Sequence, residues 1–296
     1  MTDRIGRRDF LALATSAPLM ALSPKPGRIF ACVNEVSSAN VDFRLAMEGY
    51  AKAGLKAVEP FFQPLNAFVS RESPSTARRV LGDLGLTPVS MASIGGIVEP
   101  TPDRQKSVDM WKSRLELARA IGVDRYVVPV LGTQKYVAED YKKAVDNLRD
   151  AGEVAKSFGI TAEIEFTRTS TLAASFSTAL ALVREANHPN VRLMIDTFHF
   201  WGGPSKFEEL EELRDGEVIH VHLEDVPRQP VHELLEQRDR VFPGEGIAPL
   251  RRIIELLKRK KYTGALSVEM MDPMIQSMDS YQLGLKVRAT VERLLT

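Results

Sequence analysis

Four acidic or histidine residues stand at the ends of four short apolar segments in the second half of the chain: Glu165, Asp196, His222 and Glu269. A carboxylate or an imidazole at the C-terminal end of a buried strand is a common way to build a metal or catalytic site. Any one of them could be only a helix cap or a salt-bridge partner. Four on successive strands predict a single shared site.

A divalent cation is the chemistry that this set favours. Three carboxylates held close together would repel one another and raise one another's pKa, and a cation removes that conflict. Three oxygen donors and one nitrogen suit Mn²⁺, and also Mg²⁺, Co²⁺ or Zn²⁺, with positions left for substrate oxygens. We therefore predict one divalent metal ion, with Mn²⁺ as the first choice.

Alternation along three of the strands supports this prediction. Side chains two residues apart share a face of a strand, so Glu163 joins Glu165, His220 joins His222, and Ser267 lies on the face of Glu269. Unpaired carboxylates are costly to bury among aliphatic side chains, so this face must point into a barrel. Glu163 and His220 then lie deeper and support or fill the interior.

The elements that must position these residues alternate between short apolar runs and amphipathic helices. Eight strands are predicted, each followed by a helix: 28–33, 56–58, 87–92, 125–130, 160–166, 191–195, 217–223 and 265–270. This order predicts an α/β fold, a closed parallel (β/α)8 TIM barrel over residues 28–296. A doubly wound open sheet is the alternative, but no Gly-rich phosphate turn follows the first strand.

Composition narrows the function classes. The 296 residues contain 39 Lys+Arg and 39 Asp+Glu, so no net charge favours nucleic acid. Cys32 is the one cysteine, which excludes an internal disulfide. We expect no stable membrane span after processing, because no run reaches about 18 apolar residues.

The N-terminus differs from the rest of the chain. Arg7 and Arg8 precede Phe10 and Leu11, and an uncharged apolar segment continues to Leu22. This pattern resembles a twin-arginine export signal, so residues 1–27 are predicted to be a signal segment and linker. The export machinery would then be a partner and the periplasm the destination. A basic N-terminal helix of a cytoplasmic protein is the alternative.

From Arg28 to the C-terminus the chain resembles the xylose isomerase-like barrel superfamily, and within it the inosose (keto-inositol) isomerases. The motifs that carry the resemblance are Cys32-Val33-Asn34-Glu35, Glu163-Ile164-Glu165-Phe166, Asp196-Thr197-Phe198-His199-Phe200, His220-Val221-His222-Leu223-Glu224-Asp225, Asp239-Arg240-Val241-Phe242-Pro243-Gly244-Glu245-Gly246 and Ser267-Val268-Glu269.

The resemblance implies roles for individual residues. The metal ligands would be Glu165, Asp196, His222 and Glu269, and the two glutamates would also be the acid/base pair. Residues expected to contact substrate oxygens are His199, Arg240, Asn34 and Glu59. The implied reaction is isomerisation or epimerisation of a small keto sugar or cyclitol through an enediolate. The family also suggests a homo-oligomer.

Three other functions remain open at this stage. A lyase that dehydrates a keto-inositol or a related ring would use the same metal and the same proton abstraction. An exported sugar-binding protein would need the pocket without an acid/base pair. A DNA-repair endonuclease of the endonuclease IV type shares the barrel but uses histidines from both halves of the chain, and here none precedes His188.

Overall fold

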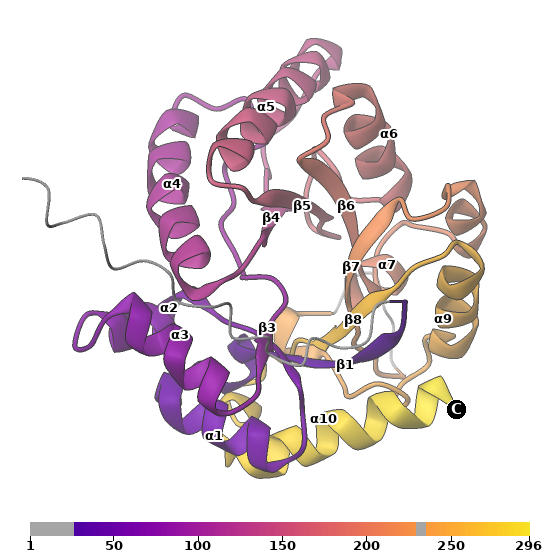
Figure 1. Ribbon diagram of the computed structural model, residues 1–296. Helices are drawn as coiled ribbons and strands as arrows, with labels where there is room; N and C mark the ends of the chain where they lie inside the picture. The colour runs from indigo at the N-terminus through magenta and orange to yellow at the C-terminus, as the bar shows by residue number, and fades with distance from the viewer. Residues whose placement is uncertain (1–26, 229–234) are drawn as a thin grey trace, which may run out of the picture.

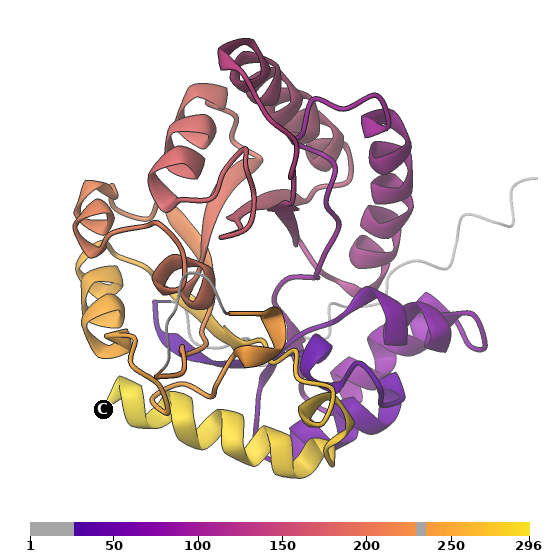
Figure 2. The ribbon, with the colours of Figure 1, turned by 180° about the vertical axis from the view of Figure 1, so that it is seen from behind.

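The structure is a computed structural model that describes residues 27–228 and 235–296, which form a parallel barrel wrapped by helices (Figures 1 and 2). The predicted signal segment therefore lies outside the described residues, apart from Gly27. The strands are β1 Ile29–Asn34, β2 Ala57–Glu59, β3 Thr87–Pro88, β4 Arg125–Val130, β5 Thr161–Phe166, β6 Val191–Asp196, β7 Val218–His222 and β8 Gly264–Val268.

All strand pairings among these eight are parallel, in the order β3-β2-β1-β8-β7-β6-β5-β4. The two end strands meet where the N–H of Val127 in β4 donates to the carbonyl of Met91, just beyond β3, at 3.0 Å. The predicted (β/α)8 barrel is confirmed.

Helices cover the outside of the barrel: α1 Phe43–Lys52, α2 Phe62–Val69, α3 Pro74–Asp83, α4 Arg104–Ile121, α5 Ala138–Ser157, α6 Phe176–Ala186, α7 Thr197–Trp201, α9 Leu250–Arg259 and α10 Ser280–Leu295. Short 3₁₀ turns add η1 Glu35–Ser38, η2 Phe207–Glu212, η3 Gln237–Asp239 and η4 Ile275–Ser277. Within the described ranges, every helix is too short or too polar to cross a membrane.

Local sequence explains where several helices begin. The hydroxyl of Ser73 accepts the N–H of Thr76 at 3.1 Å, and Pro74 occupies the first helical position of α3. Ser175 caps α6 and Asp279 caps α10 in the same way. The buried faces of the outer helices share one apolar core with the strands, and Trp111 of α4 is fully buried in it.

Three elements differ from the sequence-based expectation. The third strand was predicted over 87–92, but the regular strand is only Thr87–Pro88, because Pro88 offers no N–H to a ladder; farther along, parallel pairing continues as an isolated bridge between Ala92 and Phe61. Helix α2 was not predicted, because Phe61, the residue just before it, provides no side-chain cap. The five-residue helix α7 is also new, and it is capped by a site residue, Asp196.

The first and last helices lie side by side and close the outer layer (Figures 1 and 2). A Cβ at Gly49 of α1 would lie 2.6 Å from Cβ of Ser280 and 2.7 Å from the backbone nitrogen of Tyr281. A Cβ at Gly284 of α10 would lie 2.7 Å from Cβ of Ala53. Both glycines therefore permit a backbone approach that alanine would obstruct.

We expect Gly49→Ala to lower the free energy of unfolding by about 1–3 kcal/mol, as overpacking does, although alanine favours a helix. Denaturant unfolding would measure it. Glu48→Ala, on the exposed face of the same helix, is the control and should change stability by less than about 0.5 kcal/mol. Equal stability of Gly49→Ala and the wild type would contradict the close contact.

Candidate active site

The structure brings together the four residues predicted as metal ligands at the C-terminal ends of β5 to β8. Donor atoms of Glu165, Asp196, His222 and Glu269 all lie within 4.8 Å of one another, and all four side chains are buried. Nδ1 of His222 lies 3.5 Å from Glu165 Oε1, 3.5 Å from Glu269 Oε2 and 4.0 Å from Asp196 Oδ2.

Strand register and one helix cap produce this convergence. Asp196 ends β6 directly opposite His222 in β7, and His222 lies opposite Ser267 in β8, two residues before Glu269. Oδ1 of Asp196 then accepts the N–H of His199 at 2.8 Å, which begins α7. The spacing Asp-x-x-His thus reflects a helix cap that fixes the carboxylate.

These residues fit a divalent cation. Within the described part of the chain, Glu165 Oε1 and His222 Nδ1 are buried and have no hydrogen-bond partner. Donors about 2.1 Å from one ion lie about 3–4 Å apart, close to the separations around His222 Nδ1. Three carboxylates and one imidazole offer such an ion charge neutralisation and a mixed oxygen and nitrogen donor set.

Below this group lies a second layer of polar side chains. Glu59 in β2 is fully buried, and its carboxylate accepts from Nε2 of His222 at 3.1 Å, from Nε2 of His220 at 2.9 Å and from the hydroxyl of Ser267 at 2.7 Å. Glu163 lies in the same interior and accepts from Ser90 at 2.6 Å. The expectation that Glu163 and His220 lie deep is confirmed.

Arg240 compensates much of the negative charge. Its guanidinium lies 2.8 Å from Asp196, 3.0 Å from Glu224 and 3.3 Å from Glu269, and two further contacts reach Oε1 of Gln237. These five contacts match the five N–H groups of an arginine. Arg240 therefore lies in the predicted site, but its donors are directed at protein oxygens.

The loop after β7 holds Arg240 in place. Val241 and Asp225 exchange two backbone hydrogen bonds, of 2.9 and 3.1 Å. The carboxylate of Asp225 also accepts four backbone N–H groups, including those of Gly244 and Gly246 at 3.0 Å. A Cβ at Gly246 would lie 2.2 Å from a carbonyl oxygen, so this close turn requires glycine.

Burial and charge shift the acidity of the carboxylates. Burial raises the pKa of Glu165 to about 7, and the charges of Asp196 and Glu269 act in the same direction. Burial likewise raises the pKa of Glu269. For Asp196 burial is outweighed, mainly by the charge of Arg240, and its pKa lies below the usual range. Burial also raises the pKa of Glu224 well above its usual range, but that carboxylate is bonded to the N–H of Glu269 and to Arg240. Glu165 and Glu269 are therefore the carboxylates of raised pKa among the four predicted ligands.

His199 lies beside this group as a neutral ring. Burial lowers the pKa of His199 to about 4. Its Nδ1 accepts the backbone N–H of Arg168 at 3.3 Å, which leaves the ring proton on Nε2. Nε2 is 3.9 Å from Asp196 Oδ2. His199 can therefore donate a hydrogen bond to an oxygen placed above the carboxylates.

Two residues predicted to contact substrate, Asn34 and Glu59, are hydrogen-bonded to protein groups in the structure. Asn34 is fully buried and donates to Glu269 Oε1 at 3.1 Å, so it orients that carboxylate. Glu59 lies under His222 with its carboxylate bonded to protein donors, not at the open end. The structure therefore places Glu59 beneath the four predicted ligands, with its carboxylate held by groups of the barrel interior.

Two residues that contact Glu269 or Arg240 were not predicted as site residues. Glu224 accepts the N–H of Glu269 at 2.8 Å and pairs with Arg240. Its signal was present, since it continues the alternation of His220 and His222. Gln237 comes from the long loop, where no periodic pattern could have indicated it.

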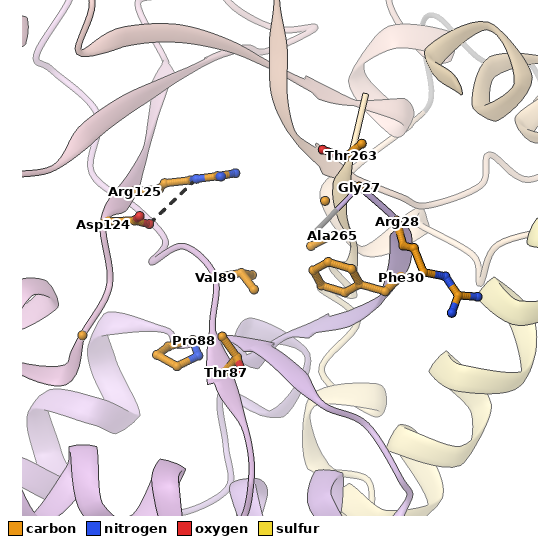
Figure 3. A pocket seen from close by; sticks show the side chains of 12 residues that line it. Gly27, Arg28, Phe30, Thr87, Pro88, Val89, Asp124, Arg125, Thr263 and Ala265 are labelled. Atoms are coloured by element: carbon orange, nitrogen blue, oxygen red, sulfur yellow. Dashed lines mark ion pairs between the residues drawn. The ribbon is translucent and has the colours of Figure 1, made fainter. Parts of the chain in front are cut away.

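A separate cavity of about 310 Å³ opens at the opposite end of the barrel (Figure 3). It is lined by residues at the N-terminal ends of strands, among them Phe30, Thr87 and Arg125. Arg125 pairs there with Asp124 at 3.8 Å. In barrels of this kind chemistry takes place at the C-terminal end, so we place the active site at the acidic group.

Comparison with known proteins decides the family. Residues 48–289 match the family described as Xylose isomerase-like TIM barrel. The chain belongs to this family.

Relatives of this xylose isomerase-like barrel are enzymes. An inosose isomerase of Halalkalibacterium halodurans is 31% identical over 166 residues, which cover 55% of this chain and 58% of that protein. A 3-dehydroshikimate dehydratase of Pseudomonas putida is 26% identical over 225 residues, 75% of this chain and 35% of that one. The chain thus matches somewhat more than half of the length of the isomerase and about a third of the length of the dehydratase.

A solved structure shows the same fold with a metal. The crystal structure of the protein named IOLI, described with a bound zinc atom, superposes with a TM-score of 0.83 at 23% identity. The match covers 90% of this chain and 98% of that one. A metal has thus been observed in another protein that has this fold.

The buried ion pairs of Arg240 generate a prediction. Arg240→Met leaves carboxylates uncompensated in a buried site, so the free energy of unfolding of the cation-free protein should fall by about 3–5 kcal/mol. Arg238→Met is the matched control, because that side chain is 63% exposed and its ion pair is with the equally exposed Glu236. This variant should cost less than about 1 kcal/mol. Chemical denaturation measures both, and equal effects would contradict the role of Arg240.

Proposed function

We propose that this protein is a metal-dependent isomerase or epimerase of a small keto sugar or cyclitol of the inosose type. The observation that carries the proposal is the pair Glu165 and Glu269, two buried carboxylates with raised pKa on either side of His222 Nδ1, 3.5 Å away in each case. A raised pKa makes a carboxylate a stronger base and lets its protonated form return the proton.

The chain's own residues would divide the work as follows. One glutamate takes the proton from the carbon next to the substrate carbonyl, and the electron pair of that C–H bond forms the carbon–carbon double bond of an enediolate. The other glutamate returns a proton, either to the neighbouring carbon or to the opposite face of the same carbon. His199 donates to a substrate oxygen as negative charge develops.

A divalent cation, when bound by Glu165, Asp196, His222 and Glu269, would supply Lewis acidity toward the carbonyl and hydroxyl oxygens. We propose Mn²⁺ first, and Mg²⁺, Co²⁺ or Zn²⁺ as alternatives. Asp196, whose pKa is lowered, keeps its charge for this role. Asn34 contacts one carboxylate oxygen of Glu269 and Arg240 the other, so the carboxylate that would return the proton has a defined position.

A dehydratase is the second candidate, and the match to a 3-dehydroshikimate dehydratase favours it. The first step would be the same proton removal. Instead of a returned proton on carbon, the β-hydroxyl would leave as water after protonation by the other glutamate.

Proton exchange tests the proposal. The protein is incubated with Mn²⁺ in D₂O and a panel of keto sugars and inososes, and the carbon-bound hydrogens are followed by NMR. We expect metal-dependent loss of the hydrogen next to the carbonyl, and at least a 100-fold slower exchange in Glu165→Gln or Glu269→Gln, because general acid–base groups contribute about 10²–10⁴-fold.

Chelator-treated protein is the control and should show no exchange. A new hydrogen pattern in the product would identify an isomerase or epimerase, and a product that has lost water a dehydratase. Exchange that persists in both glutamine variants would contradict the acid/base pair.

We also propose export by the twin-arginine route, on the pattern Arg7-Arg8-Asp9-Phe10-Leu11. Replacement of both arginines, Arg7→Lys with Arg8→Lys, should leave the full chain in the cytoplasm, because the paired arginines are the recognised feature. Fractionation of expressing cells with an antibody to the barrel measures this. An unchanged distribution would favour the cytoplasmic alternative.

A further inference from the structure

The layer beneath the four proposed ligands is built around Glu59. This side chain has no exposed surface, and neither do its surroundings, since His220, His222 and Ser267 are at most 1% exposed. A buried carboxylate is stable only when hydrogen-bond donors replace the water it has lost. Three donors do so here, at 2.7 to 3.1 Å.

These hydrogen bonds decide which nitrogen of His222 faces the site. Nε2 lies 3.1 Å from both oxygens of Glu59, so it carries a proton and donates. Nδ1 is then the nitrogen that can present a lone pair, and it points at Glu165 and Glu269. Carboxylates that accept the second N–H of a ligating histidine fix the ring and make it a better donor.

We infer that Glu59 is the positioning residue of the metal site: its carboxylate holds His222 with the Nε2–H directed at Glu59 and Nδ1 directed at the proposed cation. The inference rests on the proposed function, in which the four residues above bind a divalent ion. Glu59 touches neither the ion nor the substrate and acts through His222.

Only an acceptor without donors can serve all three neighbours. His220 and His222 each direct an N–H at Glu59, and Ser267 adds a hydroxyl. A glutamine would place its NH₂ against one imidazole. If the NH₂ faced His222, that ring would have to carry its proton on Nδ1, where the cation should bind. If the NH₂ faced His220, that ring would have to shift its own proton, and His222 would still lose its negatively charged partner.

The test compares Glu59→Gln with Glu163→Gln in the full chain. Glu163 is a matched control, because it is also fully buried in the barrel but its described partners are Ser90 and Arg125, not the four ligands. Dissociation constants for Mn²⁺ and Zn²⁺ are measured on folded, metal-depleted protein by competition with a chromophoric chelator. We expect roughly 10–100-fold weaker binding in Glu59→Gln and wild-type binding in Glu163→Gln.

A second measurement needs no variant. In zinc-loaded wild-type protein with ¹⁵N-labelled histidine, NMR should show His222 bound through Nδ1, with an Nε2–H proton protected from exchange. Ligation through Nε2, or a rapidly exchanging Nε2–H, would overturn the inference, as would wild-type metal affinity in Glu59→Gln. If the wild type binds no divalent ion at all, the proposed function itself fails, which is a distinct result.

Discussion

Negative charge buried at the open end of the barrel is the constraint on which the rest of this structure depends. Glu165, Asp196, Glu269 and Glu224 lie together with little solvent to screen them. Charges in such surroundings interact far more strongly than in water, so each must be offset nearby. Arg240 does this from the loop side and His222 from the barrel side, but burial still raises the pKa of Glu165 and Glu269.

Two layers inside the barrel separate chemistry from support. Alternation along β7 places His222 above His220, and along β8 it places Glu269 above Ser267. The upper member of each pair faces the open end, and Glu59 beneath accepts from both lower members and from Nε2 of His222. A rigid lower layer keeps the upper groups in position, because a site moved by a fraction of an ångström loses much of its efficiency.

The sequence was most informative where a residue's role is local. Asp196 and His222 end their strands, Glu165 is the last residue but one of β5, and Glu269 directly follows β8, so apolar runs and period-two alternation were enough to predict them. The position of Glu59 beneath the site was not predicted, because its partners His220 and His222 lie 161 and 163 residues away, and barrel register decides that contact. Asn34 meets Glu269 across 235 residues for the same reason. Helix α2 was missed because it starts without a side-chain cap.

The same site can serve an isomerase or a dehydratase, and the difference lies in which donor meets which substrate oxygen. Both reactions begin with removal of a proton beside a carbonyl. Elimination then requires a proton at the departing hydroxyl, whereas isomerisation requires it at carbon. Arg240 offers little here, since its five N–H groups already meet protein oxygens. His199 Nε2 and the protonated glutamate are the donors that remain. Neutral His199 can only hydrogen-bond a substrate oxygen, so the protonated glutamate is the group that gives up a proton. A substrate that places its β-hydroxyl against this glutamate would be dehydrated, and one that places carbon there would be isomerised.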